Sequence, residues 1–237
     1  RRSRESSLRK RHRAMKRVAV VLLSGGLDST TALYWAKAKG YGIVALSVRY
    51  GQRHDRELRS ARAVARAAGV PIHEVTVTLP WLSGSSLTNR KLRIPDMQLK
   101  KIGRGGVPST YVPGRNTIFL SLAVSLADAI GASAVVIGAN ALDYSGYPDC
   151  RPPFIGAFSK VAKYGTKRGS EGRPLAILAP LLRLDKKGVV RLAQKVGAPL
   201  RLTWSCYAGK ARPCGRCDSC KLRAKGFKEA GLADPAV

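Results

Sequence analysis

Residues 24–30 of this 237-residue chain read SGGLDST. They follow an apolar run, Val18–Leu23, and lead directly into sequence that favours a helix from Asp28 onward. A buried strand that ends in small residues and turns at once into a helix presents backbone N–H groups and the positive end of the helix dipole to an anion. Two adjacent glycines let a phosphate approach the backbone closely, and hydroxyl side chains add donors. The stretch therefore predicts a phosphate-binding turn.

This turn is not a Walker A loop, which has a longer glycine spacing and a lysine before its Ser or Thr. The corresponding residue here is Asp28, and an acid that faces a phosphate suggests a magnesium ion between them. A strand–Gly-Gly–helix turn that serves packing alone is the alternative interpretation. The complete string resembles the signature of the PP-loop ATP pyrophosphatases, which cleave ATP between its α and β phosphates.

Apolar runs and helical patterns alternate along the rest of the chain, with glycines at several helix ends. The expected strands are Val18–Leu23, Ile43–Val48, Ile72–Val77, Ala134–Gly138 and Leu175–Leu178. The expected helices are Asp28–Lys39, Glu57–Ala68, Asn116–Ile130, Phe154–Tyr164 and Lys186–Val196. This order predicts an α/β fold: a Rossmann-like parallel sheet with helices on both faces. Because ligands bind at the carboxyl ends of such strands, segments 24–30, 49–54 and 139–150 should converge on one cleft.

Three regions are expected. Residues 1–16 form a basic, flexible arm, because the first 17 residues carry nine Lys or Arg, one Glu and no hydrophobic periodicity. Residues 17–200 form the nucleotide-binding domain, interrupted at 79–110 by a polar loop long enough to cover a ligand. Residues 201–237 form a small metal-binding region. No apolar run approaches the ~20 residues that span a bilayer, so we expect a cytoplasmic protein without a membrane partner.

The net charge is +29, from 43 basic and 14 acidic residues. A protein this basic attracts polyanions, which makes nucleic-acid binding one interpretation. No RNA-binding pattern of aromatic and basic residues accompanies the charge. We therefore favour a general basic bias together with an anionic substrate, and we expect no stable nucleic-acid partner.

Four of the five cysteines lie within 15 residues of one another, with the spacing C-x7-C-x2-C-x2-C. They are Cys206, Cys214, Cys217 and Cys220. This spacing fits a closed, tetrahedral and therefore structural zinc site. An iron–sulfur cluster, which also uses four thiolates, is the main alternative. Disulfides are not expected because nothing marks the chain as secreted, and a redox dithiol would account for only two of the four.

Further strings strengthen the resemblance: YGQRH at 50–54, VPGRN at 112–116, YPDCRP at 147–152, LTWSCY at 202–207, and the cysteine block at 212–226. From about Val18 to Pro235 the chain resembles the 7-cyano-7-deazaguanine synthases, the QueC family of PP-loop enzymes. The resemblance implies an AMP-forming carbon–nitrogen ligase of the queuosine and archaeosine pathways. Such an enzyme converts 7-carboxy-7-deazaguanine and ammonia to 7-cyano-7-deazaguanine through adenylated acid and amide intermediates, with ATP and magnesium. It also implies one structural zinc per chain, a homodimer and, since nothing resembles a glutaminase domain, free ammonia.

The resemblance assigns the ATP phosphates to one continuous segment. Its residues are Leu23, Ser24, Gly25, Gly26, Leu27, Asp28, Ser29, Thr30, Thr31, Ala32 and Leu33. Three residues are candidates for catalysis. Asp28 would hold magnesium or fix the loop, and Ser29 would bind phosphate. Arg115 would neutralise charge that develops on the α-phosphate, an electrostatic effect of the kind that often dominates such steps.

Seven other residues are candidate substrate contacts: Arg53, His54, Asn116, Asp143, Asp149, Lys163 and Lys167. All except Arg53 have a structural alternative. Asn116 suits a helix cap, the two aspartates suit turns, and the two lysines suit a solvated surface. His54 suits the start of a helix.

Two other functions compete with the nitrile-forming ligase. One is a PP-loop enzyme that adenylates a tRNA base, which the positive charge favours and the YPDCRP string disfavours. The other is a zinc-ribbon nucleic-acid-binding protein on a degenerate nucleotide fold, which the intact SGGLDS string disfavours.

Overall fold

The computed structural model describes residues 17–140 and 146–236. The basic arm predicted at 1–16 and the candidate substrate contact Asp143 lie outside these described residues. Within them, none of the helices combines the length and the apolar character that crossing a bilayer requires.

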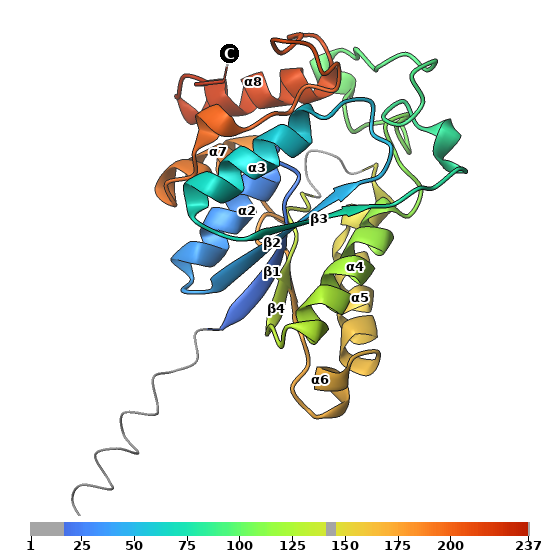
Figure 1. Ribbon diagram of the computed structural model, residues 1–237. Coiled ribbons are helices and arrows are strands. Elements are labelled where there is room, and N and C mark those ends of the chain that lie inside the picture. Colours follow the sequence, from blue (N-terminus) through green and yellow to red (C-terminus); the bar gives the residue numbers. More distant parts are fainter. Residues whose placement is uncertain (1–16, 141–145, 237) are drawn as a thin grey trace, which may run out of the picture.

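A parallel sheet of five strands forms the centre of the molecule, in the order β3-β2-β1-β4-β5 (Figure 1). The strands are β1 (Val18–Leu22), β2 (Gly42–Arg49), β3 (Ile72–Thr76), β4 (Ala134–Val136) and β5 (Ala176–Leu178). The central strand β1 is apolar without alternation because both of its faces are covered. Val21 packs into the core on one face and Val20 into the core on the other. The predicted α/β parallel fold is confirmed.

Helices cover both faces of the sheet (Figure 1). One layer contains α2 (Leu27–Ala38), α3 (Arg56–Ala68), α7 (Lys186–Lys195) and α8 (Asp218–Ala230). The other contains α4 (Arg115–Ala129) and α5 (Pro152–Tyr164), with the short α6 (Lys167–Ser170) beside α5. Helix α8 is a further element of the region 201–237, which the sequence analysis described only by its cysteine cluster. The last two cysteines lie at the start of a regular helix that packs along α7.

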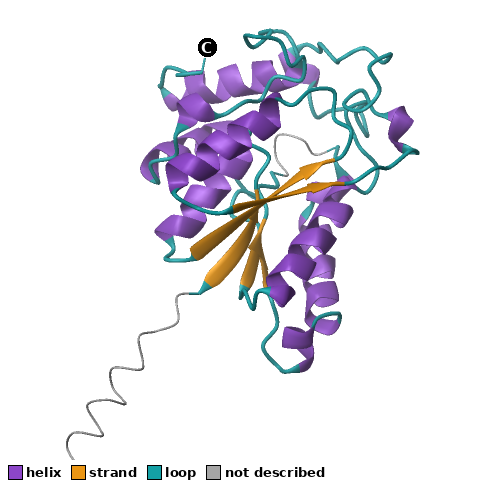
Figure 2. Cartoon of the chain, in the orientation of Figure 1, coloured by secondary structure: helices purple, strands orange, loops and turns teal. Residues whose placement is uncertain are grey.

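The chain between β3 and α4 is largely irregular (Figure 2). Its regular structure is limited to two short 3-10 turns, η1 (Leu82–Gly84) and η2 (Leu99–Lys101). Two further 3-10 turns, η3 (Pro148–Cys150) and η4 (Leu200–Leu202), occur later in the chain. Most helix and strand ends agree with the sequence prediction to within two residues. The predicted fourth strand is shorter: β4 ends at Val136, and residues 137–140 line the cavity.

Candidate active site

A cavity of about 280 Å³ lies at the carboxyl ends of β1, β2 and β4. Its wall includes residues from segments 22–29, 46–58, 115–119, 137–140 and 204–207. The three segments that the sequence analysis expected to converge all contribute to it. The phosphate-binding turn is thus part of a concave site built from distant parts of the chain.

The turn at 24–26 is held in a shape that only glycine permits. Gly25 has a φ of +84°, and a Cβ atom added there would lie 2.4 Å from the amide nitrogen of Ala61 and 2.4 Å from the carbonyl oxygen of Glu57. Ser29 accepts a hydrogen bond from the Ser24 amide at 3.2 Å, and the hydroxyls of these two serines lie 3.0 Å apart. Helix α3 therefore packs closely against the turn at Gly25, while the start of α2 lines the cavity.

Asp28 forms a salt bridge with Lys186, the first residue of α7. The Lys186 ammonium donates to both carboxylate oxygens at 2.9 Å, and the lysine side chain is only 9% exposed. Of the two roles expected for Asp28, fixing the loop is consistent with this geometry, and holding magnesium remains a prediction. Sequence reasoning missed Lys186, because 158 positions separate it from Asp28 and no local motif marks it.

Arg115 begins α4 and faces the cavity. Burial opposes its charge, but Tyr50, Tyr147 and Cys150 surround the guanidinium and Tyr50 shares a hydrogen bond with it, so the net effect raises the pKa of Arg115. A permanently charged guanidinium therefore lines the same cavity as the phosphate-binding turn. This geometry suits the predicted neutralisation of charge on a phosphate.

Glu57, in the first turn of α3, also lines the cavity. Burial raises its pKa to about 7; the charge of Arg115 acts in the opposite direction, and Cys206 adds to the rise. Its carboxylate has no hydrogen-bond partner among the described residues. Sequence reasoning treated this residue only as the beginning of a helix.

Arg53 anchors the irregular chain between β3 and α4. Its guanidinium donates to the carbonyl oxygens of Ser86 and Leu92 at 3.0 Å and of Arg90 at 2.8 Å, and Arg90 donates back to the Arg53 carbonyl at 2.9 Å. Arg53 also lines the cavity. The structure therefore directs this guanidinium to backbone carbonyls, and the predicted substrate contact remains untested.

His54 packs against the metal-binding region. Its imidazole leaves no room for a side chain at Gly209, where an added Cβ would lie 2.2 Å from the ring. The Nδ1 atom is buried without a partner among the described residues, and burial lowers the pKa of His54. A neutral ring is thus wedged between the cavity and the chain after Cys206.

Asn116 and Asp149 bond to each other rather than facing the cavity together. The Asn116 amide donates to an Asp149 carboxylate oxygen at 3.0 Å, and the Asn116 side chain donates to the Asp149 carbonyl at 3.0 Å and to Cys150 Sγ at 3.2 Å. Asp149 thereby caps the start of α4. The turn expected as the alternative for Asp149 is present as η3, whereas the helix cap expected for Asn116 is supplied by Asp149 instead. Asn116 and Cys150 also border the cavity.

The two candidate lysines lie away from the cavity. Lys163 is exposed near the end of α5, and Lys167 is exposed at the start of α6, 3.9 Å from Glu171. The structure does not bring either residue to the phosphate-binding turn.

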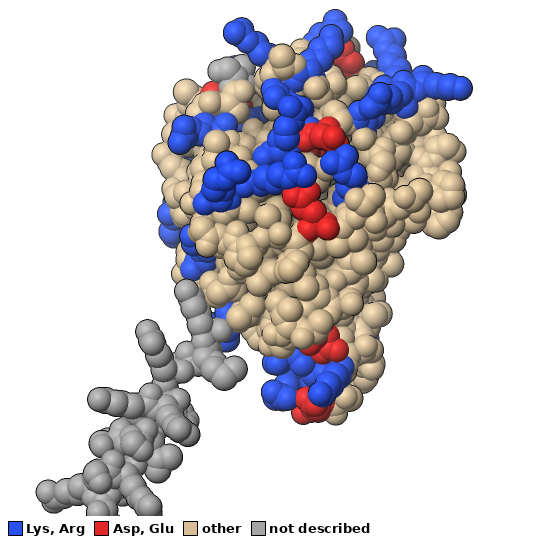
Figure 3. All heavy atoms as spheres, in the orientation of Figure 1, with Lys and Arg blue, Asp and Glu red and all other residues tan. Residues whose placement is uncertain are grey.

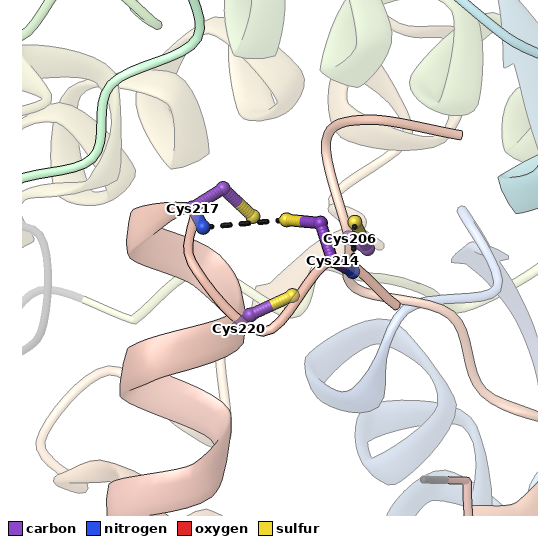
Figure 4. Close-up of side chains that lie close together, drawn as sticks. All are labelled: Cys206, Cys214, Cys217 and Cys220. Carbon is purple, nitrogen blue, oxygen red and sulfur yellow. Dashed lines mark hydrogen bonds between the residues drawn. The ribbon is translucent and has the colours of Figure 1, made fainter. Parts of the chain in front are cut away.

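The four cysteines of the C-terminal cluster come together, and their sulfur atoms lie within 4.8 Å of one another (Figure 4). Cys206 Sγ accepts N–H groups from Ala208 at 3.4 Å and from Cys214 at 3.3 Å. Hydrogen bonds from the thiols of Cys217 and Cys220 are the main cause that lowers the pKa of Cys206, and these backbone N–H groups add to it. Four clustered thiols with backbone N–H donors to sulfur fit a bound metal ion.

The cysteine cluster is joined to the phosphate-binding turn through Trp204. The Trp204 amide donates to the Gly25 carbonyl at 2.9 Å, and its indole N–H donates to the Cys206 carbonyl at 2.8 Å. Arg56 covers the indole ring at 4.4 Å. The cluster therefore supports one wall of the cavity.

Comparisons with known proteins identify the family of this chain. Residues 18–231 match the family described as queuosine biosynthesis protein QueC. Similar curated proteins named 7-cyano-7-deazaguanine synthase include one from Anaeromyxobacter dehalogenans, 54% identical over 92% of this chain and 94% of its own length. Another, from Thermosynechococcus vestitus, is 52% identical over 92% of this chain and 94% of its own length. The solved structure of NMN synthetase from Francisella tularensis is 14% identical, with a TM-score of 0.47 over 97% of this chain and 82% of that one. The match over residues 18–231 and the two curated relatives show that the chain belongs to the QueC family of queuosine biosynthesis proteins.

Proposed function

We propose that this chain converts 7-carboxy-7-deazaguanine and ammonia to 7-cyano-7-deazaguanine, with two ATP cleaved to AMP and pyrophosphate. The observation that carries the proposal is the cavity: a glycine turn at a helix start faces it beside Arg115, in a chain whose relatives bear this synthase name. A carboxylate reacts poorly with ammonia because oxide is a poor leaving group. Adenylation replaces it with AMP.

The reaction uses the same site twice. In the first reaction cycle a carboxylate oxygen attacks the α-phosphorus and pyrophosphate leaves. Ammonia then displaces AMP and forms the amide. In the second reaction cycle the amide oxygen attacks the α-phosphorus of a second ATP, and loss of AMP forms the nitrile. The N–H groups at the start of α2 hold the phosphates, and the Arg115 guanidinium stabilises the charge that develops on them. Magnesium, when bound with ATP, would offset phosphate charge near Asp28.

We further propose that the cysteine cluster holds zinc. Zn–S bonds of about 2.3 Å place tetrahedral ligands about 3.8 Å apart, which suits sulfur atoms clustered within 4.8 Å. All four positions are protein ligands, so the ion would be structural. Because Trp204 joins the cluster to Gly25, the ion would stabilise the phosphate-binding turn indirectly.

The remaining expectations belong to the same proposal: a cytoplasmic homodimer that uses free ammonia and requires no nucleic acid. Basic side chains gather over α3 and near α8 (Figure 3), including the exposed Arg59, Arg62 and Arg66. Charge of this kind would attract polyanions whatever the enzyme's substrate.

The test incubates the purified protein with ATP, magnesium, ammonium and 7-carboxy-7-deazaguanine, and identifies products by mass spectrometry. Nitrile formation with AMP supports the proposal. An unchanged acid would refute it, and AMP formed only after addition of tRNA would favour a base-adenylating enzyme instead.

A further inference from the structure

The proposed chemistry requires a proton acceptor in the cavity. Nitrogen that has added to the adenylated acid must lose a proton before the neutral amide can form. The adenylated amide must also lose its N–H protons as the nitrile forms. The phosphate-binding turn and Arg115 donate hydrogen bonds or positive charge, so they cannot accept these protons.

Two carboxylates occur among the described residues that line the cavity, Asp28 and Glu57. Asp28 is engaged by the Lys186 ammonium through both of its oxygens. Glu57 has no hydrogen-bond partner in the described part of the chain. Its carboxylate is therefore the one of the two that is open to a ligand.

The backbone of Glu57 packs against the phosphate-binding turn, and its side chain lines the cavity. Its carbonyl oxygen forms the wall against which Gly25 packs, because a Cβ on Gly25 would approach that oxygen to 2.4 Å. The charge of Arg115, from α4, acts on the Glu57 carboxyl across the cavity. Helix α3 thus brings a carboxylate into the wall of the cavity that the phosphate-binding turn and the Arg115 guanidinium also line.

His54 is the other basic side chain without a fixed positive charge in the cavity wall. Its ring packs against the backbone at Gly209, and its Nδ1 atom is buried. Since a general base must come within hydrogen-bond reach of the proton that it accepts, His54 is the poorer candidate.

We propose that Glu57 is the catalytic base for the nitrogen steps of the proposed reaction. This inference rests on the proposed function. Ammonia forms a C–N bond with the acyl carbon, the C–O bond to AMP breaks, and AMP leaves with the electron pair. A Glu57 carboxylate oxygen takes the proton from the added nitrogen and passes it to solvent. In the second reaction cycle the same Glu57 oxygen accepts the N–H protons as AMP leaves and C≡N forms. No oxidant or reductant is needed.

The chemistry of Glu57 suits this role. Burial raises the pKa of its carboxyl to about 7, which makes it a stronger base than an exposed glutamate. A base with a pKa near the working pH can both accept a proton and release it in each reaction cycle.

The experiment separates adenylation from the nitrogen steps in Glu57→Gln. Adenylation is followed by acid-dependent exchange of labelled pyrophosphate into ATP without ammonium; the nitrogen steps are followed by ammonium-dependent amide and nitrile formation. Loss of the general base should lower the rate of ammonium-dependent amide and nitrile formation about 100-fold or more. The rate of pyrophosphate exchange into ATP should change less than about threefold. Glu229→Gln, on the exposed end of α8, is the matched control and should leave both rates unchanged.

Three results would overturn the assignment of Glu57 as the catalytic base. Full ammonium-dependent turnover in Glu57→Gln overturns the inference, and so does an equal loss of both rates in a folded variant with unchanged metal content. If Glu57→Gln does not fold, Glu57→Asp, which keeps a shorter carboxylate, must retain more ammonium-dependent turnover than Glu57→Ala, or the inference fails. Failure of the proposed function itself is distinct, because the unmodified protein would then form neither amide nor nitrile.

Discussion

Replacement of Lys186 by Met should destabilise the protein by leaving Asp28 without its partner. The lysine side chain is 9% exposed and donates to both Asp28 oxygens at 2.9 Å. Breaking a buried pair from one side costs roughly 3–5 kcal/mol, whereas exposed pairs contribute roughly 0–1 kcal/mol. Asp28 is 29% exposed, so water in the cavity reduces the cost, and we expect about 2 kcal/mol. For a chain of this size that corresponds to a Tm lower by about 4–8 °C.

A double-mutant cycle isolates the pair. The free energy of unfolding is measured by urea denaturation for Lys186→Met, Asp28→Asn, the double variant and the unmodified protein. We expect the two single changes to be non-additive by about 1–2 kcal/mol, because either one removes the same interaction. Additivity within about 0.3 kcal/mol would show that the salt bridge does not hold the turn at α2 to α7, and would refute the reasoning.

Three other perturbations test separate parts of the site. Gly25→Ala should reduce ATP binding at least about tenfold, because its Cβ would overlap the Glu57 carbonyl and Ala61 amide; isothermal titration calorimetry measures this, and unaltered affinity would contradict the geometry. Cys217→Ser should lose about one zinc per chain and lower the Tm, by atomic absorption and calorimetry, since structural zinc binding is coupled to folding; a stoichiometric loss of iron instead would contradict the zinc assignment. Glu57→Gln should stabilise the metal-loaded protein at pH 8 but not at pH 4.5. The pKa of the Glu57 carboxyl is about 7 in the folded protein, against an ordinary value of 4.5. The unmodified protein therefore loses up to about 3 kcal/mol of stability as pH rises from the lower value through the higher one. The glutamine variant has no carboxyl to ionise and keeps its stability over this pH range. Equal Tm differences between variant and unmodified protein at the two pH values would exclude such a shift.

The elements that sequence alone predicts are those governed by local pattern. The strand at Val18–Leu22 and the turn after it follow from an apolar run and two glycines. The four cysteines, whose spacing is local, also come together as expected. These features need only neighbouring residues to be recognised.

The residues that sequence did not predict depend on contacts between distant segments. Lys186 reaches Asp28 from a helix far along the chain, and Glu57 joins the cavity wall as a half-buried residue only when α3 packs on the phosphate-binding turn. Arg53 lines the cavity, and the irregular chain after β3 folds back and supplies carbonyl oxygens to it, contacts that the sequence did not predict. Pairings of this kind arise from tertiary packing, which no short motif encodes.

The most direct measurement follows the oxygen atoms of the substrate. 7-Carboxy-7-deazaguanine labelled with ¹⁸O in both carboxylate positions is converted with unlabelled ATP in unlabelled water, and the products are analysed by mass spectrometry. If the acid and then the amide are adenylated, each nitrile is accompanied by two AMP molecules that each carry one ¹⁸O atom. Nitrile formed with unlabelled AMP, or with ¹⁸O in inorganic phosphate or water, would contradict adenylation at this site.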